Sequence, residues 1–190
     1  MHMNKLPEFY PYILKDTYDL GFEQLSDESI GSLLSTLCAS KINGKFLEIG
    51  TGTGLSTSWM LHGMSSSSTL VTVDNDLRLT EVAKKYLSSD HRVEFVTGNG
   101  ESLIKELPDS SIDLIFADTW PGKYNHLEEA LSLLKIGGLY IIDDMTPINS
   151  WPESHTQLAL KLEKDLNSKN NFTFTKLNWS SGIMVGVKNA

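Results

Sequence analysis

The sequence predicts an α/β protein with a Rossmann-like sheet of seven strands, mostly parallel, with a C-terminal antiparallel hairpin and helices on both faces. From Lys45 onward, short apolar runs alternate with helical patterns, which is typical of parallel strands joined by helical crossovers. Near the C-terminus, two β-rich runs at 172–177 and 183–187 lie close enough in sequence to pair as an antiparallel hairpin.

The remaining elements follow from hydrophobic periodicity and from turn residues. Strands are expected at 46–49, 70–73, 93–96, 112–117 and 139–142. Helices are expected at 55–62, 77–88, 101–106, 124–135 and about 155–167. Asn75 or Asp76 can cap the second of these helices. Gly137-Gly138 is expected to end the fourth and to release the chain into the fifth strand.

The N-terminal part is read as helical. Residues 5–20 show only weak periodicity, whereas Asp27 and Glu28 open a helix with a clear apolar stripe. With 190 residues, the chain is expected to form one domain, 1–190. In it, 1–40 would be a helical segment covering the edge of the site, and 45–188 the ligand-binding core.

Composition limits the classes of function. The net charge of −8 offers no electrostatic footprint for phosphate backbones, which weighs against nucleic acid as substrate. The single cysteine, Cys38, cannot form an internal disulfide, so a reducing compartment fits. No stretch approaches the length of a transmembrane helix, so a cytoplasmic protein without a membrane partner is expected.

The stretch 46–56, FLEIGTGTGLS, organises the chain. It reads as strand, Gly-rich turn and helix N-terminus, which brings backbone N–H groups close to a bound ligand. The spacing G-x-G-x-G is not the G-x-G-x-x-G expected for NAD or FAD. The carboxylate of Glu48 would repel a pyrophosphate, yet it suits a cationic amine or sulfonium. A tight turn without a ligand is the alternative.

On these residues the sequence resembles the class I S-adenosylmethionine-dependent methyltransferases, whose E-x-G-x-G-x-G motif holds the methionine end of the cofactor. The resemblance covers about residues 22–188. It implies that S-adenosyl-L-methionine is the cofactor and that Asp74 accepts the ribose hydroxyls; a helix cap is the structural alternative for Asp74. The implied cofactor-binding residues are Glu48, Gly50, Thr51, Gly52, Gly54, Ser56, Asp74, Asn75, Asn99, Gly100, Glu101, Asp118 and Trp120.

Two further strand ends, DTWPGKY at 118–124 and DDM at 143–145, resemble the catechol and caffeoyl-CoA type O-methyltransferases. The resemblance implies that Asp118, Asp143 and Asp144 bind a divalent cation such as Mg²⁺, although the third position is usually Asn in that family. Carboxylate oxygens favour hard cations. Three uncompensated carboxylates would be costly, which favours a cation or a bound basic group. Loop capping by Asp143 or Asp144 is the alternative.

The resemblance leaves the catalytic base open, because the family's general-base Lys falls on Pro121. The catalytic candidates are Asp118, Lys123 and His155, with a surface Lys and a solvated His as the structural alternatives. Trp120 matches a tryptophan that packs on the adenine, whereas a core Trp is its alternative. The expected function is methyl transfer to the hydroxyl of a small-molecule acceptor, with a homodimer as one expected assembly. Methylation of nitrogen, a carboxylate or a macromolecule, and a non-catalytic cofactor-binding module, are the alternatives.

Overall fold

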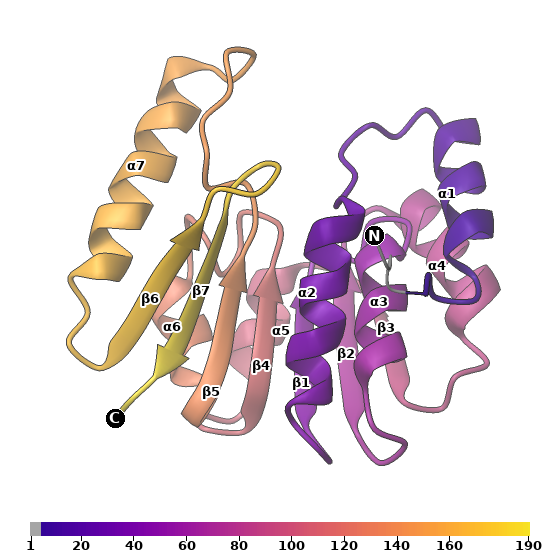
Figure 1. Cartoon of the computed structure of the whole chain (residues 1–190), viewed down its shortest axis with the longest axis horizontal. Helices are drawn as coiled ribbons and strands as arrows, with labels where there is room; N and C mark the ends of the chain where they lie inside the picture. The colour runs from indigo at the N-terminus through magenta and orange to yellow at the C-terminus, as the bar shows by residue number, and fades with distance from the viewer. Residues whose placement is uncertain (1–4) are drawn as a thin grey trace. The chain divides into compact units, whose positions relative to one another are not determined.

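The computed structural model describes residues 5–190, so residues 1–4 of the predicted N-terminal segment lie outside the described part. The chain forms two compact units, Met1–Asn99 and Gly100–Ala190, called unit 1 and unit 2 below (Figure 1). Across residues 5–190, no helix combines the length and the apolar composition needed to cross a bilayer. The expectation of a single domain stays a prediction.

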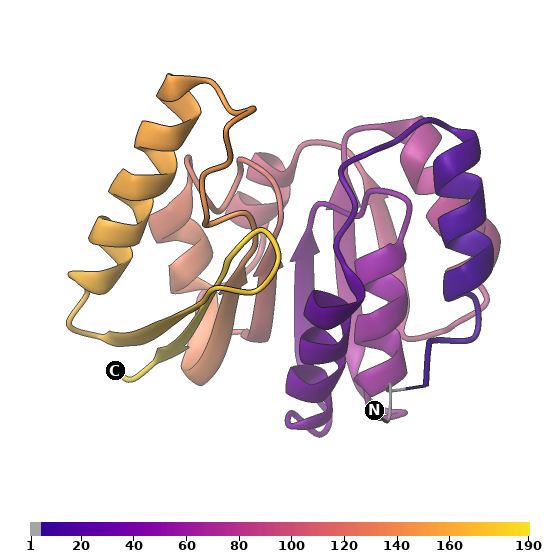
Figure 2. The ribbon, with the colours of Figure 1, turned by 45° about the horizontal axis from the view of Figure 1, so that its top comes forward.

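Unit 1 contains three parallel strands in the spatial order β3-β2-β1. Leu47 lies opposite Val71, and Val73 lies opposite Val96, so the three strands end close to one another at their carboxyl ends. Helix α1 packs against α3 and α4, and α2 packs against α3 (Figure 2). The elements are α1 (Tyr10–Asp19), α2 (Glu28–Ala39), β1 (Lys45–Ile49), α3 (Leu55–Gly63), β2 (Thr69–Asp74), α4 (Leu77–Leu87) and β3 (Val93–Thr97).

Aspartates cap two helices of unit 1. The carboxylate of Asp27 accepts the N–H groups of Ser29 at 2.8 Å and Ile30 at 2.9 Å, which begins α2 where the sequence predicted it. Asp76 accepts the N–H of Arg78 at 2.9 Å and so caps α4. Because Asp76 is the cap, the neighbouring Asp74 is left for another role.

Unit 2 contains four strands in the order β4-β5-β7-β6. β4 and β5 are parallel, whereas β7 is antiparallel to both β5 and β6, which confirms the predicted hairpin. Helix α7 packs beside β6 (Figure 1). The elements are α5 (Gly100–Glu106), β4 (Ile112–Ala117), α6 (Leu127–Ser132), β5 (Leu134–Ile142), α7 (Glu153–Asn167), β6 (Phe172–Leu177) and β7 (Ile183–Lys188).

The expected role of Gly137-Gly138 is wrong. Both glycines lie inside β5, and α6 ends earlier, at Ser132. Leu133 caps the end of α6 and Leu134 begins β5, and both are buried; an apolar pair at a helix end looks the same in sequence as one at a strand start. Gly137 has a φ of 78°, and the pairing of β5 with β4 shifts register in this region. The glycines therefore allow an irregularity within β5 and do not end a helix.

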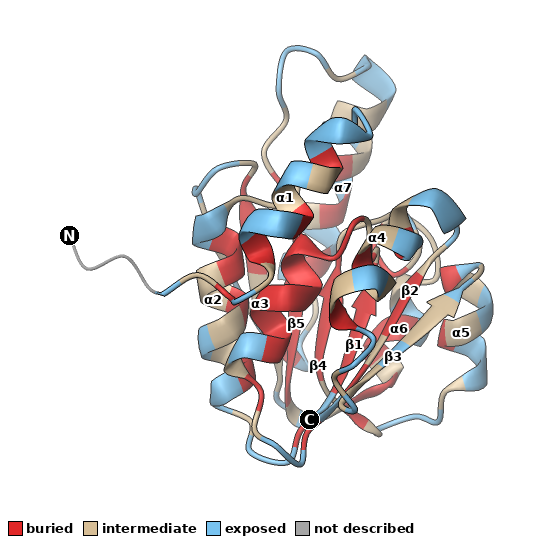
Figure 3. Ribbon diagram, turned by 90° about the vertical axis from the view of Figure 1, so that its right-hand side faces the viewer, coloured by how far each residue is buried: buried red, intermediate tan, exposed pale blue. Residues whose placement is uncertain are grey.

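The core of each unit lies around its central strands. In unit 1 the apolar side chains of β1 are almost completely buried, as are most of those on α3 (Figure 3). In unit 2 the second half of β5, from Leu139 to Ile142, is buried, as expected for an interior strand that pairs with β4 on one side and β7 on the other. The strand interiors are therefore apolar, and polar residues gather where the strands end.

Candidate active site

The Gly-rich loop follows β1 directly. Gly50, Gly52 and Gly54 have φ values of 112°, 51° and 93°, which side chains other than glycine rarely tolerate. At Gly54 a Cβ atom would also lie 2.8 Å from the Cβ of Ala83, so α3 begins in close contact with α4. The alternating glycines of the sequence are therefore required by the backbone of the turn.

Asp74 ends β2 beside this loop. Its Oδ2 accepts the N–H of Gly52 at 2.8 Å, and its Oδ1 accepts the N–H of Asp76 at 2.9 Å. The carboxylate is partly exposed, so each oxygen retains acceptor capacity toward a ligand. The helix-cap alternative for Asp74 is wrong, because Asp76 fills that position.

Glu48 is 0% exposed, and hydroxyl groups satisfy its carboxylate. It accepts hydrogen bonds from Ser56 at 2.6 Å, Thr57 at 2.5 Å and Thr72 at 2.6 Å. Burial raises the pKa of Glu48 to about 7, although the three hydroxyls oppose the rise. Glu48 thereby fastens α3 to β2 around the Gly-rich loop. Its predicted contact with the cofactor stays a prediction.

Threonine hydroxyls extend this buried network. Thr51 and Thr72 share a hydrogen bond of 2.6 Å, and Thr17 of α1 donates to Thr53 at 2.7 Å. The sequence singled out Thr51 and Ser56 but missed Thr57 and Thr72. Thr57 is a hydroxyl residue near the start of a helix, and Thr72 is one on the adjacent strand. Hydroxyl residues are so common at such positions that the sequence does not identify them as partners of a buried acid.

The third strand end is more exposed. Asn75 and Asn99 are exposed, and the N–H of Gly98 donates to the Asp74 carbonyl at 2.9 Å. Gly100 and Glu101 open α5 in unit 2. Glu101 is engaged there, since Asn125 donates to its Oε1 at 2.7 Å and its Oε2 lies 3.4 Å from Nε2 of His126.

In unit 2, acidic residues follow β4 and β5 directly. Ala117 lies opposite Ile142, so Asp118 and Asp143 both follow a paired position. Asp143 is 3% exposed, and its Oδ1 accepts from Oγ of Ser181 at 2.5 Å and from the N–H of Asp144 at 2.7 Å. Burial raises the pKa of Asp143 to about 6. Asp118 and Asp143 therefore follow neighbouring strand ends, and their predicted role as a metal site with Asp144 stays a prediction.

Lys123 is the cation of this region. The residue is only 4% exposed, so the structural alternative of a surface lysine is wrong. Burial lowers the pKa of Lys123, while Asp144, Asp118 and Asp143 act in the opposite direction. Turn hydrogen bonds hold it inward, because Gly122 N–H donates to the Asn125 carbonyl at 2.8 Å and the hydroxyl of the buried Tyr140 donates to the carbonyl of Gly122.

An aromatic cluster lies beside Lys123 and consists of Trp120, Tyr124, Trp151 and His155. Trp120 is 55% exposed, which excludes the core alternative for this residue. The ring of His155 stacks on Trp151 with centroids 4.1 Å apart, and Tyr124 meets both His155 and Trp120 edge to face at 5.4 Å. His155 is therefore half-buried and held by aromatic neighbours.

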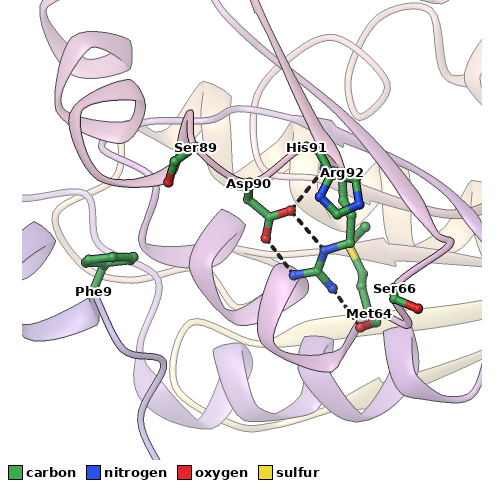
Figure 4. Close-up of a pocket in the computed structure, with 7 residues that line it drawn as sticks. All are labelled: Phe9, Met64, Ser66, Ser89, Asp90, His91 and Arg92. Carbon is green, nitrogen blue, oxygen red and sulfur yellow. Dashed lines mark hydrogen bonds and ion pairs between the residues drawn. The ribbon is translucent and has the colours of Figure 1, made fainter.

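A separate pocket of about 550 Å³ lies near the start of β3 and is lined by no residue of the Gly-rich loop (Figure 4). Arg92 on its wall is already engaged, because Asp90 binds its guanidinium at 2.6 Å and the Met64 carbonyl accepts from it at 2.8 Å (Figure 4). The carboxyl ends of the strands, where ligands bind in open α/β sheets, are at the other end of β3. This pocket therefore has no part in the predicted site.

Known proteins share the fold of the whole chain. An O-methyltransferase from Bacillus cereus, crystallised with S-adenosylhomocysteine, has a TM-score of 0.85 at 22% identity, covering 100% of this chain and 94% of that one. A Staphylococcus aureus protein described as a "putative caffeoyl-CoA O-methyltransferase" has a TM-score of 0.80 at 21% identity, covering 99% and 94%. These similarities confirm the Rossmann-like fold that the sequence predicted.

Sequence comparison identifies the family. Over 119 residues the chain is 31% identical to a Mycobacterium ulcerans protein named "Putative O-methyltransferase". That match covers 60% of this chain and 53% of the relative, so the chain spans about half the length of that protein. The family model described as "Methyltransferase domain" matches residues 47–145, and with more than half of its 190 residues matched the chain belongs to this family of methyltransferase domains.

Proposed function

We propose that this chain transfers the methyl group of S-adenosylmethionine to a hydroxyl oxygen of a small-molecule acceptor. The observation that carries the proposal is the Gly-rich loop at the end of β1, tied to Asp74 by the 2.8 Å hydrogen bond from Gly52. Family membership and the cofactor product bound to the Bacillus cereus relative support this choice of cofactor.

Unit 1 supplies most of the proposed cofactor contacts. Asp74 would accept the ribose hydroxyls, and the loop that Glu48 fastens would hold the methionine end. The other proposed contacts from unit 1 are Gly50, Thr51, Gly52, Gly54, Ser56, Asn75 and Asn99. From unit 2 the proposal includes Gly100, Glu101, Asp118 and Trp120. S-Adenosylmethionine supplies an electrophilic methyl group, which the acceptor oxygen attacks in line with the departing sulfur.

Asp118, Lys123 and His155 of unit 2 are proposed to serve the acceptor. The buried ammonium of Lys123 would offset the carboxylates and stabilise negative charge on an acceptor oxygen. Catalysis would rest mainly on positioning the oxygen and on removing its proton.

The predicted divalent cation competes with Lys123 for the same carboxylates. Among residues 5–190, no three acidic, His or Cys side chains are grouped so as to hold a metal ion. One oxygen of Asp143 is also engaged with Ser181. As arranged, these residues fit a buried ammonium better than a divalent ion, and the metal role of Asp118, Asp143 and Asp144 stays a prediction.

The proposal also covers the class of acceptor, the cellular location and the assembly of the enzyme. The net charge of −8 favours a small acceptor over nucleic acid, and the single cysteine fits a cytoplasmic protein. A homodimer is proposed as the assembly, and sedimentation velocity over a range of protein concentrations tests it. A single monomeric species at every concentration would refute the dimer.

Calorimetry tests the cofactor, and a transfer assay tests the reaction. S-Adenosylhomocysteine should bind and NAD should not, because the loop spacing and Glu48 disfavour a pyrophosphate. Radioactive methyl from S-adenosylmethionine should then appear in a phenol, a hydroxy acid or an acyl-CoA acceptor. Preferential binding of NAD would refute the proposal that S-adenosylmethionine is the cofactor. Tight binding of S-adenosylhomocysteine without transfer to any acceptor would instead indicate a binding module.

A further inference from the structure

Tyr124 and His155 are joined by a hydrogen bond in unit 2. Oη of Tyr124 lies 3.1 Å from Nε2 of His155, and the two rings meet edge to face with an interplanar angle of 86°. Tyr124 comes from the loop after β4, and His155 from the first turn of α7. The sequence suggested His155 alone, since nothing in it connects residues 31 positions apart.

Aromatic rings fix the orientation of His155. Trp151 stacks on the imidazole with an interplanar angle of 19°, and Trp120 lies at 6.1 Å with an angle of 30°. Stacking on these rings restricts rotation of the imidazole about the Cβ–Cγ bond of His155. Nε2 of His155 therefore stays directed at the hydroxyl of Tyr124.

The environment also sets which atom holds the proton. Burial raises the pKa of Tyr124 to about 12, and Asp144 adds to the rise. Burial lowers the pKa of His155, Lys123 lowers it further, and Asp144 opposes both. Near neutral pH the phenol is therefore protonated and the imidazole is neutral, and with the imidazole proton on Nδ1 the hydroxyl donates to Nε2.

We propose, on the basis of the proposed function, that Tyr124 and His155 form the proton path of methyl transfer. The acceptor hydroxyl donates its proton to Oη of Tyr124, and the proton of Tyr124 moves to Nε2 of His155. The acceptor oxygen bonds to the methyl carbon as the sulfur–methyl bond breaks and its electron pair returns to sulfur. The positive charge of the sulfonium is thereby replaced by that of the imidazolium, so atoms and charge balance.

In this path the two residues have different roles. Tyr124 contacts the acceptor and is a catalytic residue, whereas His155 acts through Tyr124 as the final proton acceptor. The arrangement also accounts for Pro121 at the position of the family's general-base lysine, because the base has moved to another residue. Lys123 then keeps its ammonium for the carboxylates around it.

Tyr124→Phe and His155→Gln test the path, with the exposed Tyr18→Phe and His91→Gln as matched controls. The best acceptor of the wild type in the phenol, hydroxy acid and acyl-CoA panel serves as the probe. Both test variants should lose about 100-fold or more in kcat, while KM and the affinity for S-adenosylhomocysteine change less than threefold. The kcat of the wild type should fall as the pH is lowered and His155 takes up a proton. The pH profile of His155→Gln should lack this fall at low pH.

A second measurement does not depend on turnover. In ¹⁵N-histidine NMR spectra, the Nε2 resonance of His155, assigned with His155→Gln, should show an accepted hydrogen bond that is lost in Tyr124→Phe. An unchanged Nε2 resonance, or test variants that keep kcat within threefold with the wild-type pH profile, would overturn the proton path. Loss of cofactor affinity with an unchanged pH profile would show a merely structural role. A wild type without any methyl transfer would instead overturn the proposed function.

Discussion

The carboxylate of Asp74 closes the Gly-rich loop from the neighbouring strand, because its Oδ2 accepts the N–H of Gly52 at 2.8 Å. One side chain thus shapes the loop and offers acceptor oxygens at the same edge. A ribose with two hydroxyl groups would find a partly exposed, already oriented carboxylate there.

Asp74→Ala should therefore weaken binding of S-adenosylhomocysteine by roughly 1–3 kcal/mol, since buried ribose hydroxyls would lose their acceptor. Calorimetry measures the change directly. Asp76→Ala is the control: it removes the cap of α4 and should cost about 1 kcal/mol of stability without a comparable loss of affinity. Equal affinities of the wild type and Asp74→Ala would show that Asp74 only orders the loop.

Gly54→Ala should destabilise the fold by roughly 1–3 kcal/mol, because the residue has a φ of 93° and its Cβ would lie 2.8 Å from Ala83. Gly98→Ala is the matched control, since a Cβ there meets nothing within 4 Å. Urea unfolding of the two variants measures the difference. If both variants unfold at the same urea concentration, α3 and α4 do not need the close approach.

Local sequence patterns predicted much of this fold, because the hydrophobic periodicity of a strand or helix depends on residues that are close in sequence. β4 and β6 have the predicted bounds, and Asp27 begins α2 as expected. The end of α6 was missed, since Leu133 and Leu134 suit a helix and a strand equally.

The site was predicted less completely. Polar strand ends are visible in sequence, but pairs such as Tyr124 with His155 depend on how separate loops approach. The burial of Lys123 was also out of reach, because it results from the turn at Gly122 and from Tyr140 in another element.

Glu48 should make stability depend on pH. Its pKa is about 7 in the folded chain against an ordinary 4.5, so the folded state binds this proton more tightly than the unfolded state. Stability should therefore fall as pH rises from about 4.5 to 7, by on the order of 3 kcal/mol from this group. Glu48→Gln, which stays neutral, should lose this slope.

Urea unfolding of Glu48→Gln at pH 5 and pH 8 measures the effect, with Glu81→Gln on the exposed face of α4 as the control. From pH 5 to pH 8, the free energy of unfolding of Glu48→Gln should increase relative to that of the wild type. The free energy of unfolding of Glu81→Gln relative to the wild type should not increase. A constant difference for Glu48→Gln would mean that the buried carboxylate is already ionised at pH 5.

Lys123 and a divalent cation are rival sources of positive charge for Asp118, Asp143 and Asp144. If the buried ammonium fills this role, EDTA should leave wild-type turnover within twofold. Lys123→Met should lower turnover and stability, because it removes the cation from the buried Asp143 and the half-buried Asp118 and Asp144. Mg²⁺ should then raise the melting temperature of Lys123→Met more than that of the wild type, since an ion that binds only the folded state stabilises it.

Lys135→Met is the control, because Lys135 pairs with Asp113 at 2.8 Å on a partly exposed surface and should contribute less than about 1 kcal/mol. Affinity for S-adenosylhomocysteine should survive in Lys123→Met, which separates a loss of charge balance from a loss of cofactor. If EDTA abolishes wild-type turnover and Mg²⁺ restores it, the three carboxylates hold a metal as the family resemblance implies. Lys123 would then have to move aside when the ion binds, and Asp144→Asn, which matches the usual family residue, should keep most of the activity.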